Sequence, residues 1–259
     1  MATRLDAAVA EQLGVTRSQA RSLIMEGRVR VNGTPAVKPG ANLREGAVVE
    51  IERPRRFVSR GGEKLDAALE AFSIDTTGVR ALDVGASTGG FTDCLLQRGA
   101  EQVVAVDVGY GQLDWKLRND SRVTVMERTN FRYLAPETFA RKFSLIVIDT
   151  SFISLRTIVS RAVEELSEDG SIVALVKPQF EAGRERLGSG GVVRDPEVHR
   201  AVLREILGAM DSLGLTAVGL ISSPLRGPAG NREFLMHLRR TGETIRDERI
   251  DAVITEDAE

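Results

Sequence analysis

The stretch LDVGASTGGFTDCLL, residues 82–96, constrains the fold of this chain more than any other part of the sequence. A short apolar segment ends at Val84, a loop with three glycines follows, and an apolar segment of helical length comes next. Glycine adopts backbone conformations that other residues avoid, and it lets a ligand or a second backbone approach closely. The stretch therefore predicts a strand, a ligand-holding loop and a helix at the start of an α/β domain.

The pattern of strand and helix continues along most of the chain. We expect strands at 80–85, 102–107, 122–126, 144–149, 171–176, 216–222 and 233–238. We expect helices at 63–72, 91–98, 112–118, 153–166 and 197–213. Strands that alternate with helices are typical of a parallel sheet covered on both faces. The sequence thus predicts a Rossmann-like, doubly wound, seven-stranded α/β sheet, with the last two strands as an antiparallel edge.

The first 52 residues have a different pattern and a different charge. Two short amphipathic helices are expected within 5–26, followed by strands at 28–33 and 47–52, the first of which ends in an Asn-Gly turn. Residues 1–60 hold 11 Lys/Arg and 6 Asp/Glu, which gives them a net charge of +5. The rest of the chain has a net charge of −7, so the whole chain carries −2. A small basic α+β module on an acidic body favours a polyanionic partner. We expect domains at 1–52 and 61–245, a linker at 53–60 and a frayed acidic tail at 246–259.

Cysteine content and apolar runs bear on the compartment. The single cysteine, Cys94, cannot form a disulfide within the chain. The N-terminal stretch has no apolar signal core, and no apolar run approaches the roughly 20 residues that cross a bilayer. We therefore expect a cytoplasmic protein without a membrane partner. The two histidines, His199 and His237, are far apart in sequence, so no metal site is expected.

The glycine loop has the features of a site for S-adenosylmethionine (SAM). Its spacing is G-x-x-x-G-G rather than the G-x-G-x-x-G of a dinucleotide site, and no phosphate-binding P-loop motif occurs. Asp83 ends the first strand beside the loop, where a carboxylate repels a pyrophosphate but suits the ammonium and sulfonium of SAM. Asp107 ends the next strand, 24 residues later, where a carboxylate suits ribose hydroxyls. The expected cofactor-binding residues are Asp83, Gly85, Ala86, Ser87, Thr88, Gly89, Gly90, Phe91, Asp107, Val108, Asn130 and Asp149.

Four ionisable residues stand at boundaries of the expected elements. Lys64 opens a helix, Asp149 and Lys177 each end a strand, and Glu233 begins the last strand. Solvated charges are common at strand ends, but four such residues at one edge of the sheet favour a reaction centre.

Long motifs then connect the chain to a known family. Residues 1–52 resemble an S4 RNA-binding module, through LDAAVAEQLGVTRSQARSLIMEGRVRVNG at 5–33. Residues 59–240 resemble the FtsJ-like ribose methyltransferases. The combination with SRGGEKL, DVGASTGGFTD, DVGYGQLDWKLRND, DTSFISL and LVKPQFE resembles the TlyA family almost from end to end. Thr16 replaces the usual serine of the S4 pattern but retains a hydroxyl that can cap a helix.

The resemblance implies an activity and a role for each residue. Family members methylate the 2′-hydroxyl of cytidines in ribosomal RNA (16S, 23S or both), and some have been named haemolysins. The catalytic set of the family carries over to Lys64, Asp149, Lys177 and Glu233, and Asn130 in ERTN is expected to reach the adenine. Lys177 either accepts the proton of the hydroxyl or stays charged and orients it. The expected RNA contacts are Arg4, Arg17, Arg21, Arg28, Arg30 and Arg60.

Three other functions fit the sequence less well. A ribosome-binding assembly factor without catalysis has no need of all four ionisable residues. A membrane-active haemolysin requires an apolar or strongly amphipathic cationic segment, which the sequence lacks. A base methyltransferase requires an Asn-Pro-Pro-Tyr-type clamp or a cysteine nucleophile, and neither occurs at a strand end. Ribosomal RNA or a ribosomal subunit is thus the expected partner. The oligomeric state is not predicted.

Overall fold

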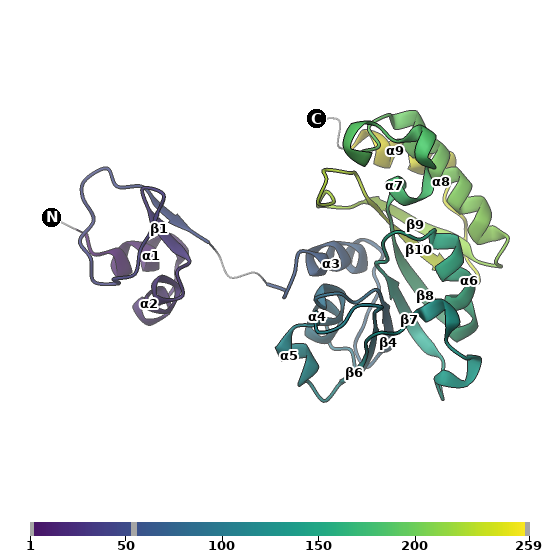
Figure 1. Ribbon diagram of the computed structural model, residues 1–259, viewed down its shortest axis with the longest axis horizontal. Helices are drawn as coiled ribbons and strands as arrows, with labels where there is room; N and C mark the ends of the chain where they lie inside the picture. Colours follow the sequence, from purple (N-terminus) through teal and green to yellow (C-terminus); the bar gives the residue numbers. More distant parts are fainter. Residues whose placement is uncertain (1–2, 53–55, 257–259) are drawn as a thin grey trace. The chain divides into compact units, whose positions relative to one another are not determined.

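A computed structural model describes residues 3–52 and 56–256. The chain divides into two compact units, Met1–Arg55 and Arg56–Glu259 (Figure 1).

The N-terminal unit places two helices on a small antiparallel sheet. Its elements are α1 (Leu5–Leu13), α2 (Arg17–Met25), β1 (Val29–Val31), β2 (Thr34–Pro35) and β3 (Val49–Ile51), with strand order β2-β1-β3. Thr16 caps α2 through a reciprocal pair of hydrogen bonds with Gln19, and this hydroxyl was the expected start signal. Asn32 and Gly33 both have positive φ, as a two-residue hairpin requires. Leu5, Val9, Ile24 and Val29 form the centre of its core.

The larger unit is built on a seven-stranded sheet of order β6-β5-β4-β7-β8-β10-β9. The strands are β4 (Arg80–Val84), β5 (Gln102–Val106), β6 (Val123–Met126), β7 (Phe143–Ile148), β8 (Leu166–Val176), β9 (Thr216–Ser222) and β10 (Phe234–Arg239). Strands β4 to β8 pair in parallel, whereas β10 is antiparallel to both β8 and β9. The predicted fold class, including the antiparallel edge, is confirmed.

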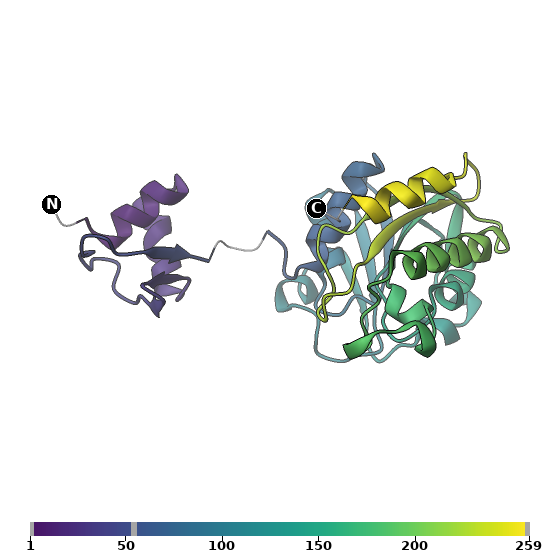
Figure 2. The ribbon, with the colours of Figure 1, turned by 90° about the horizontal axis from the view of Figure 1, so that it is seen from above.

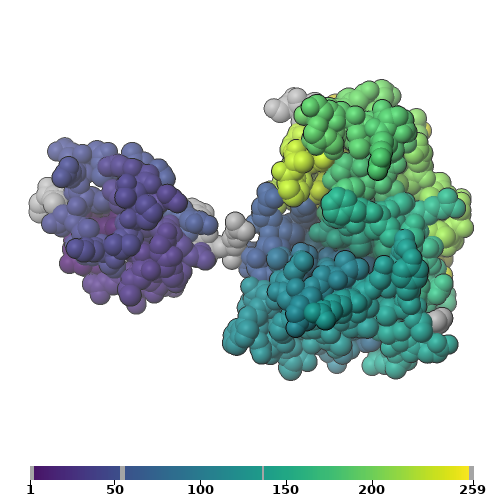
Figure 3. Space-filling model, viewed as in Figure 1, coloured from purple at the N-terminus to yellow at the C-terminus, as the bar shows by residue number. Residues whose placement is uncertain are grey.

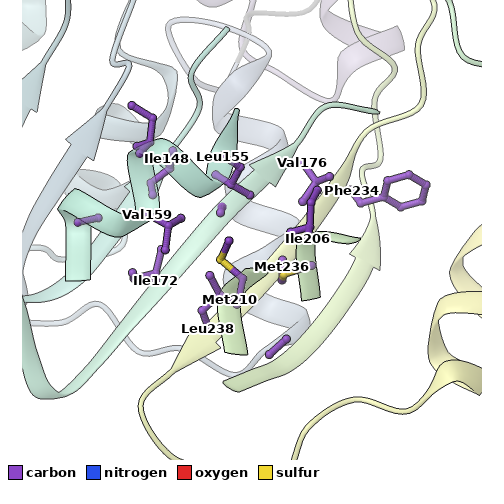
Figure 4. Packing of buried hydrophobic residues seen from close by; sticks show 14 of the residues in the cluster. Ile148, Leu155, Val159, Ile172, Val176, Ile206, Met210, Phe234, Met236 and Leu238 are labelled. Carbon is purple, nitrogen blue, oxygen red and sulfur yellow. The ribbon is translucent and has the colours of Figure 1, made fainter. Parts of the chain in front are cut away.

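Helices cover both faces of this sheet (Figures 1 and 2). The helices are α3 (Gly61–Ala71), α4 (Gly90–Gln97), α5 (Trp115–Arg118), α6 (Leu155–Glu165), α7 (Pro178–Glu181), α8 (Pro196–Asp211) and α9 (Asp247–Thr255). The apolar side chains of α3 and α4 share one core with one face of the sheet, and those of α6, α8 and α9 share a second core with the other face. Figure 4 shows part of the second core, where Leu155 and Val159 of α6 and Ile206 and Met210 of α8 lie over β8 and β10. Strands buried on both faces explain the near-continuous apolar runs in the sequence.

Strand order places a crevice at the carboxyl ends of the central strands. The chain enters at β4, proceeds outward to β5 and β6, and then returns to the other side of β4 as β7. The connections that leave β4 and β7 diverge at this point, and open α/β sheets bind their ligands at such a reversal. The glycine loop, Asp107 and Asp149 all follow strands that end there.

The expectation of a frayed tail is wrong for the part of it that the structure describes. Asp247–Thr255 form α9, whose Ile250, Val253 and Ile254 are buried in the second core. In addition, Arg232 donates to the carbonyls of Val253 and Ile254. In Figure 3 this C-terminal segment (yellow) lies against the green segments of the same unit. This tail is acidic, but its apolar residues Ile250, Val253 and Ile254 have the spacing of a helix face, and this spacing is the signal that predicts a helix.

The expected linker also differs from the structure. Residues 53–55 lie outside the described residues, but 56–60 pack onto the larger unit. Phe57 is buried, the amide of Val58 donates to Asp93 at 2.9 Å, and Gln97 donates to the carbonyl of Arg56 at 2.9 Å. The four arginines of this segment suggested a solvated connection, whereas the ring of Phe57 packs on α3 and two hydrogen bonds join the second half of the segment to α4.

Candidate active site

Two glycines of the loop after β4 are required by its backbone. Gly85 has φ +87°, and a Cβ there would lie 2.6 Å from the carbonyl oxygen of Asp149. Gly89 has φ +93°, and its Cβ would lie 2.8 Å from Leu113 Cδ1. Any other residue would suffer both strained dihedrals and steric overlap. The loop thus runs close to the end of β7, which brings the strand carrying Asp149 against it.

The motifs SRGGEKL and TGGF meet in the structure. A Cβ at Gly90 would overlap Ser59 and would lie 2.8 Å from the amide nitrogen of Gly62. A Cβ at Gly62 would in turn overlap the ring of Phe57. The amino ends of α3 and α4 can approach this closely because both carry glycine. This contact fixes Lys64, on the first turn of α3, relative to the glycine loop.

Asp83 is buried and interacts with the helix that follows it. Its Oδ2 accepts a hydrogen bond of 2.7 Å from the hydroxyl of Thr92, while Oδ1 has no hydrogen-bond partner among the described residues. Burial raises the pKa of Asp83 from 3.8 to about 7. Asp83 therefore lies behind the loop, with one carboxylate oxygen still able to accept a hydrogen bond.

Asp107 holds the loop from the end of β5. Its Oδ2 accepts from the amide of Ser87 at 2.8 Å, and its Oδ1 accepts from the amide of Gly109 at 2.6 Å. The carboxylate remains partly exposed at the crevice. A ribose hydroxyl could donate to either oxygen there, because each carboxylate oxygen has two lone pairs.

A cavity of about 540 Å³ opens beside the loop. Six of the expected cofactor-binding residues line it: Gly85, Ser87, Asp107, Val108, Asn130 and Asp149. The other six, Asp83, Ala86, Thr88, Gly89, Gly90 and Phe91, do not line it: Asp83 is buried in β4, and the other five belong to the loop and the start of α4. The volume falls within the range of small-molecule sites.

Several lining residues were missed from the sequence. Gln112, Thr129, Phe131, Arg132, Thr150, Ser151, Phe152 and Ile153 also line the cavity. Most of them follow β6 or β7, so the signal was available in their position after a strand of the central sheet. Asn130, which was predicted, accepts from the amide of Arg132 at 3.2 Å, and its amide NH₂ can still donate to a ligand.

The first of two lysine–carboxylate pairs stands at the rim of this cavity. Lys177 Nζ lies 2.6 Å from Asp149 Oδ1 and donates to Ser151 Oγ at 2.9 Å. Lys177 follows β8 and Asp149 follows β7, and these two strands are parallel neighbours. Asp149 lines the cavity, whereas Lys177 does not, so the pair spans the boundary between the cavity and the surface beside it.

The second pair lies one strand further along the sheet edge. Lys64 Nζ of α3 is 2.5 Å from Glu233 Oε2, with side-chain exposures of 10% and 1%. Phe234 pairs with Val176 in the sheet, so Glu233, directly before β10, and Lys177, directly after β8, lie at the same edge of neighbouring antiparallel strands. A Cβ at Gly227 would lie 2.6 Å from Glu233 Oε1, so this glycine leaves space for the carboxylate. The structure thus brings the four expected catalytic residues together as two pairs.

An exposed, strained aromatic residue stands at the mouth of the cavity. Phe152 has φ +63° and is 89% exposed, and its ring lies 4.9 Å from that of Phe180. Glu181 fixes the chain on its far side by accepting from the amide of Leu155 at 2.7 Å and from the hydroxyl of Ser154 at 3.0 Å. Positive φ in a phenylalanine is costly, and such strain is often found at functional sites.

The expected RNA contacts fall into two groups. Arg4, Arg17 and Arg21 in the N-terminal unit all bond to Asp6, while Arg28 pairs with Glu26 and Arg30 donates to the carbonyl of Gly33. Arg60 instead belongs to the larger unit, where it is exposed at the start of α3. The basic side chains of residues 1–60 are therefore divided between the two units.

Comparison with known proteins agrees with this architecture. The FtsJ-like methyltransferase family matches residues 57–240, and the S4 domain matches residues 3–49. The 16S/23S rRNA (cytidine-2′-O)-methyltransferase TlyA of Mycobacterium tuberculosis is 49% identical over 91% of this chain and 89% of its own length. The chain belongs to the TlyA family. Hemolysin A of Brachyspira hyodysenteriae is 40% identical over 86% of this chain and 93% of its own length. A solved structure of a putative hemolysin from Streptococcus thermophilus matches with TM-score 0.76 and 42% identity over 98% of this chain and 95% of that one.

Two further observations concern this TlyA-family chain. Among residues 3–52 and 56–256, no group of three or more His, Cys, Asp or Glu side chains is arranged to hold a metal ion. No helix in the same ranges has the length and apolar character needed to cross a membrane.

Proposed function

We propose that this chain transfers a methyl group from SAM to the 2′-hydroxyl of a cytidine in ribosomal RNA. Two of its relatives carry this activity in their names, and the FtsJ-like family to which its larger unit belongs is a methyltransferase family. The observation that carries the proposal is the Lys177–Asp149 pair at the rim of a cavity built on a glycine loop. Such a protein would act on ribosomes in the cytoplasm.

The residues around the cavity fit SAM. Asp107 offers carboxylate oxygens to a ribose diol, Asn130 offers its amide to the adenine, and the backbone of Gly85 permits close approach. Asp83 does not line the cavity; it is buried beneath the loop, where its Oδ2 accepts from Thr92 and supports the start of α4. When bound, SAM supplies an electrophilic methyl group.

Lys177 and Asp149 act on the acceptor hydroxyl. Asp149 reaches the cavity and holds Lys177 Nζ at its rim, where a ribose from outside would meet the methyl donor. Orientation of this kind accelerates a displacement by removing much of the entropy of the encounter. The hydroxyl proton passes to Lys177 if that side chain acts as the base, or to solvent if Lys177 stays charged and orients the oxygen.

Lys64 and Glu233 support this geometry from the neighbouring strand. Because Glu233 immediately precedes β10 and Lys177 immediately follows the antiparallel β8, the Glu233 carboxylate adds negative charge next to that lysine, and Lys64 balances it. We assign the pair the role of holding Glu233 in place and of keeping the sheet edge electrically balanced around the acceptor. Buried charges require such a partner.

Phe152 provides a surface for the base of the target nucleotide. A ribose inside a folded RNA reaches a pocket only when its nucleotide leaves the stack, and an exposed aromatic ring compensates for the lost stacking. Phe152 lines the same cavity as Asp149, Thr150 and Ser151, and its ring is 89% exposed. The S4 unit supplies contacts to RNA phosphates.

The test is tritium transfer from labelled SAM to purified small subunits, large subunits and naked ribosomal RNA. We expect label on one ribose of the substrate, located by reverse-transcription stops at low nucleotide concentration. Lys177→Ala should abolish transfer and retain SAM binding in calorimetry. Lys142→Ala is the matched control, since Lys142 is an exposed lysine at the opposite end of the same sheet and should leave activity unchanged. Absence of label in all three substrates, with SAM bound, would favour the assembly-factor function instead.

Lys177→Arg separates the two roles of the lysine. Arginine retains the charge and the donors but cannot accept a proton at working pH. Activity well above that of Lys177→Ala would indicate orientation, and equal loss in both variants would indicate a general base.

A further inference from the structure

Asp6 is the centre of an arginine cluster in the N-terminal unit. Its side chain is fully buried, and its two oxygens accept from three guanidinium groups. Arg4 donates at 3.1 Å to Oδ1 and at 2.9 Å to Oδ2, Arg17 at 3.2 Å to Oδ1, and Arg21 at 3.1 Å to Oδ2. One buried carboxylate thus joins arginines from the residue before α1 and from two successive turns of α2.

The arginines remain accessible although they share this anchor. The side chains of Arg4, Arg17 and Arg21 are 44%, 57% and 56% exposed. Arg17 and Arg21 each use one nitrogen for Asp6, so further N–H donors of each guanidinium are available to an anion. Three positive charges around one negative charge leave the cluster with a net charge of +2, and the negative charge is the one that is shielded from solvent.

Asp6 stays ionised across the working range of pH. The hydrogen bond from Arg4 holds the pKa of Asp6 well below its ordinary value, and Arg21 and Arg17 act in the same direction. The ionised carboxylate therefore joins the three arginines throughout this range. Free arginine side chains on a helix surface would instead sample many rotamers, and their ordering would oppose binding.

We propose that Asp6 is a positioning residue that assembles Arg4, Arg17 and Arg21 into one preorganised phosphate-binding site for the RNA backbone. The proposal rests on the proposed function, in which this unit binds ribosomal RNA. It goes beyond that function because it assigns RNA affinity to an acidic residue. Guanidinium groups bind phosphate through forked pairs of N–H donors, and this geometry depends on their orientation.

The proposal predicts an effect opposite in sign to that of simple electrostatics. Removal of a negative charge from an RNA-binding unit ordinarily strengthens binding. Asp6→Asn should instead weaken it by about tenfold, because at least two arginines lose their fixed orientation. Glu11→Gln is the matched control, since it removes one exposed negative charge from the same helix and should bind equally well or more tightly.

The experiment measures filter binding of the full-length protein to 16S and 23S ribosomal RNA transcripts over a series of salt concentrations. For the wild-type protein, log affinity should fall linearly with log salt, and Asp6→Asn should reduce this slope by about one phosphate contact. SAM binding in calorimetry should be equal in all variants. Equal or tighter RNA binding by Asp6→Asn would overturn the role of Asp6. Failure of the wild-type protein to bind either RNA would instead count against the proposed function.

A charge-preserving variant covers the case in which Asp6→Asn unfolds the small unit, as judged by circular dichroism. Arg17→Lys retains the positive charge and leaves Asp6 paired with Arg4 and Arg21, so the unit should stay folded. A lysine cannot form the same fork, and we expect about fivefold weaker RNA binding. Affinity equal to that of the wild-type protein would show that charge alone acts at this position, and the preorganised site would be refuted.

Discussion

The buried pair of Lys64 and Glu233 gives a quantitative test of the active-site architecture. The two charges lie 2.5 Å apart with side-chain exposures of 10% and 1%. At an effective dielectric constant of about 20, their attraction is about 7 kcal/mol, and desolvation of both groups offsets much of it. Loss of one partner leaves the other charge buried and unpaired. Lys64→Met or Glu233→Gln should therefore each lower the free energy of unfolding of the larger unit by about 3–5 kcal/mol.

The double variant should behave differently from the sum of the two. Lys64→Met with Glu233→Gln removes both charges, so we expect a loss of no more than about 2 kcal/mol and a coupling energy of about 3 kcal/mol or more. Differential scanning calorimetry and urea titration of the full chain measure these values. Arg204→Gln, which breaks an exposed pair with Asp247 in the same unit, should cost less than about 1 kcal/mol.

Stability and activity separate in this experiment. The double variant should fold nearly as well as the wild-type protein but transfer no methyl group, because Glu233 no longer carries charge beside Lys177. Additive effects of the two single variants, or single losses below about 1 kcal/mol, would refute the conclusion that the charges form a buried, coupled pair.

Three further predictions concern the loop, the cavity mouth and a buried histidine. Gly85→Ala should destabilise the larger unit by about 2–4 kcal/mol and abolish SAM binding in calorimetry. The control is Gly230→Ala, which has the same φ of +87° but open space around its Cβ, and it should cost only about 1–2 kcal/mol. Equal losses of stability in the two variants would contradict the overlap with Asp149. Phe152→Ala should reduce kcat/KM for RNA by about 10- to 100-fold, the value of one stacked base, and leave the SAM affinity unchanged; an unaffected rate would remove its proposed role. Burial lowers the pKa of His199 from 6.5 to about 4. Between pH 6.5 and pH 4 the unfolded state therefore binds more protons than the folded state. The free energy of unfolding falls as the pH is lowered through this range. Urea titration should show the wild-type protein losing about 2–3 kcal/mol relative to His199→Leu between pH 7 and pH 4, and parallel pH profiles would show that His199 does not titrate in this way.

Much of the fold could be predicted from the sequence because its signals are local. Buried parallel strands give apolar runs, and these located all seven strands of the large sheet, six of them to within one residue at each end, while β8 begins five residues before its expected start. The Asn32–Gly33 turn and the Thr16 cap were likewise predicted from single residues whose backbone or side-chain preferences are strong. The short α7 and the C-terminal α9 were missed, since one has a single turn and the other was hidden by acidic residues.

The chemical groups of the candidate site, and the edge of the sheet at which they lie, could be predicted from local sequence patterns. Strand ends and glycine loops mark that edge locally, and motif resemblance adds their roles. The pairing of these groups became visible in the folded chain: Lys64 with Glu233 across 169 residues, Lys177 with Asp149, and three arginines with Asp6. The fold also placed Phe57 on α3 and Phe152 at the mouth of the cavity. Pairing of charges depends on distances between elements far apart in the chain, and these distances are set by strand order and helix packing rather than by any local preference.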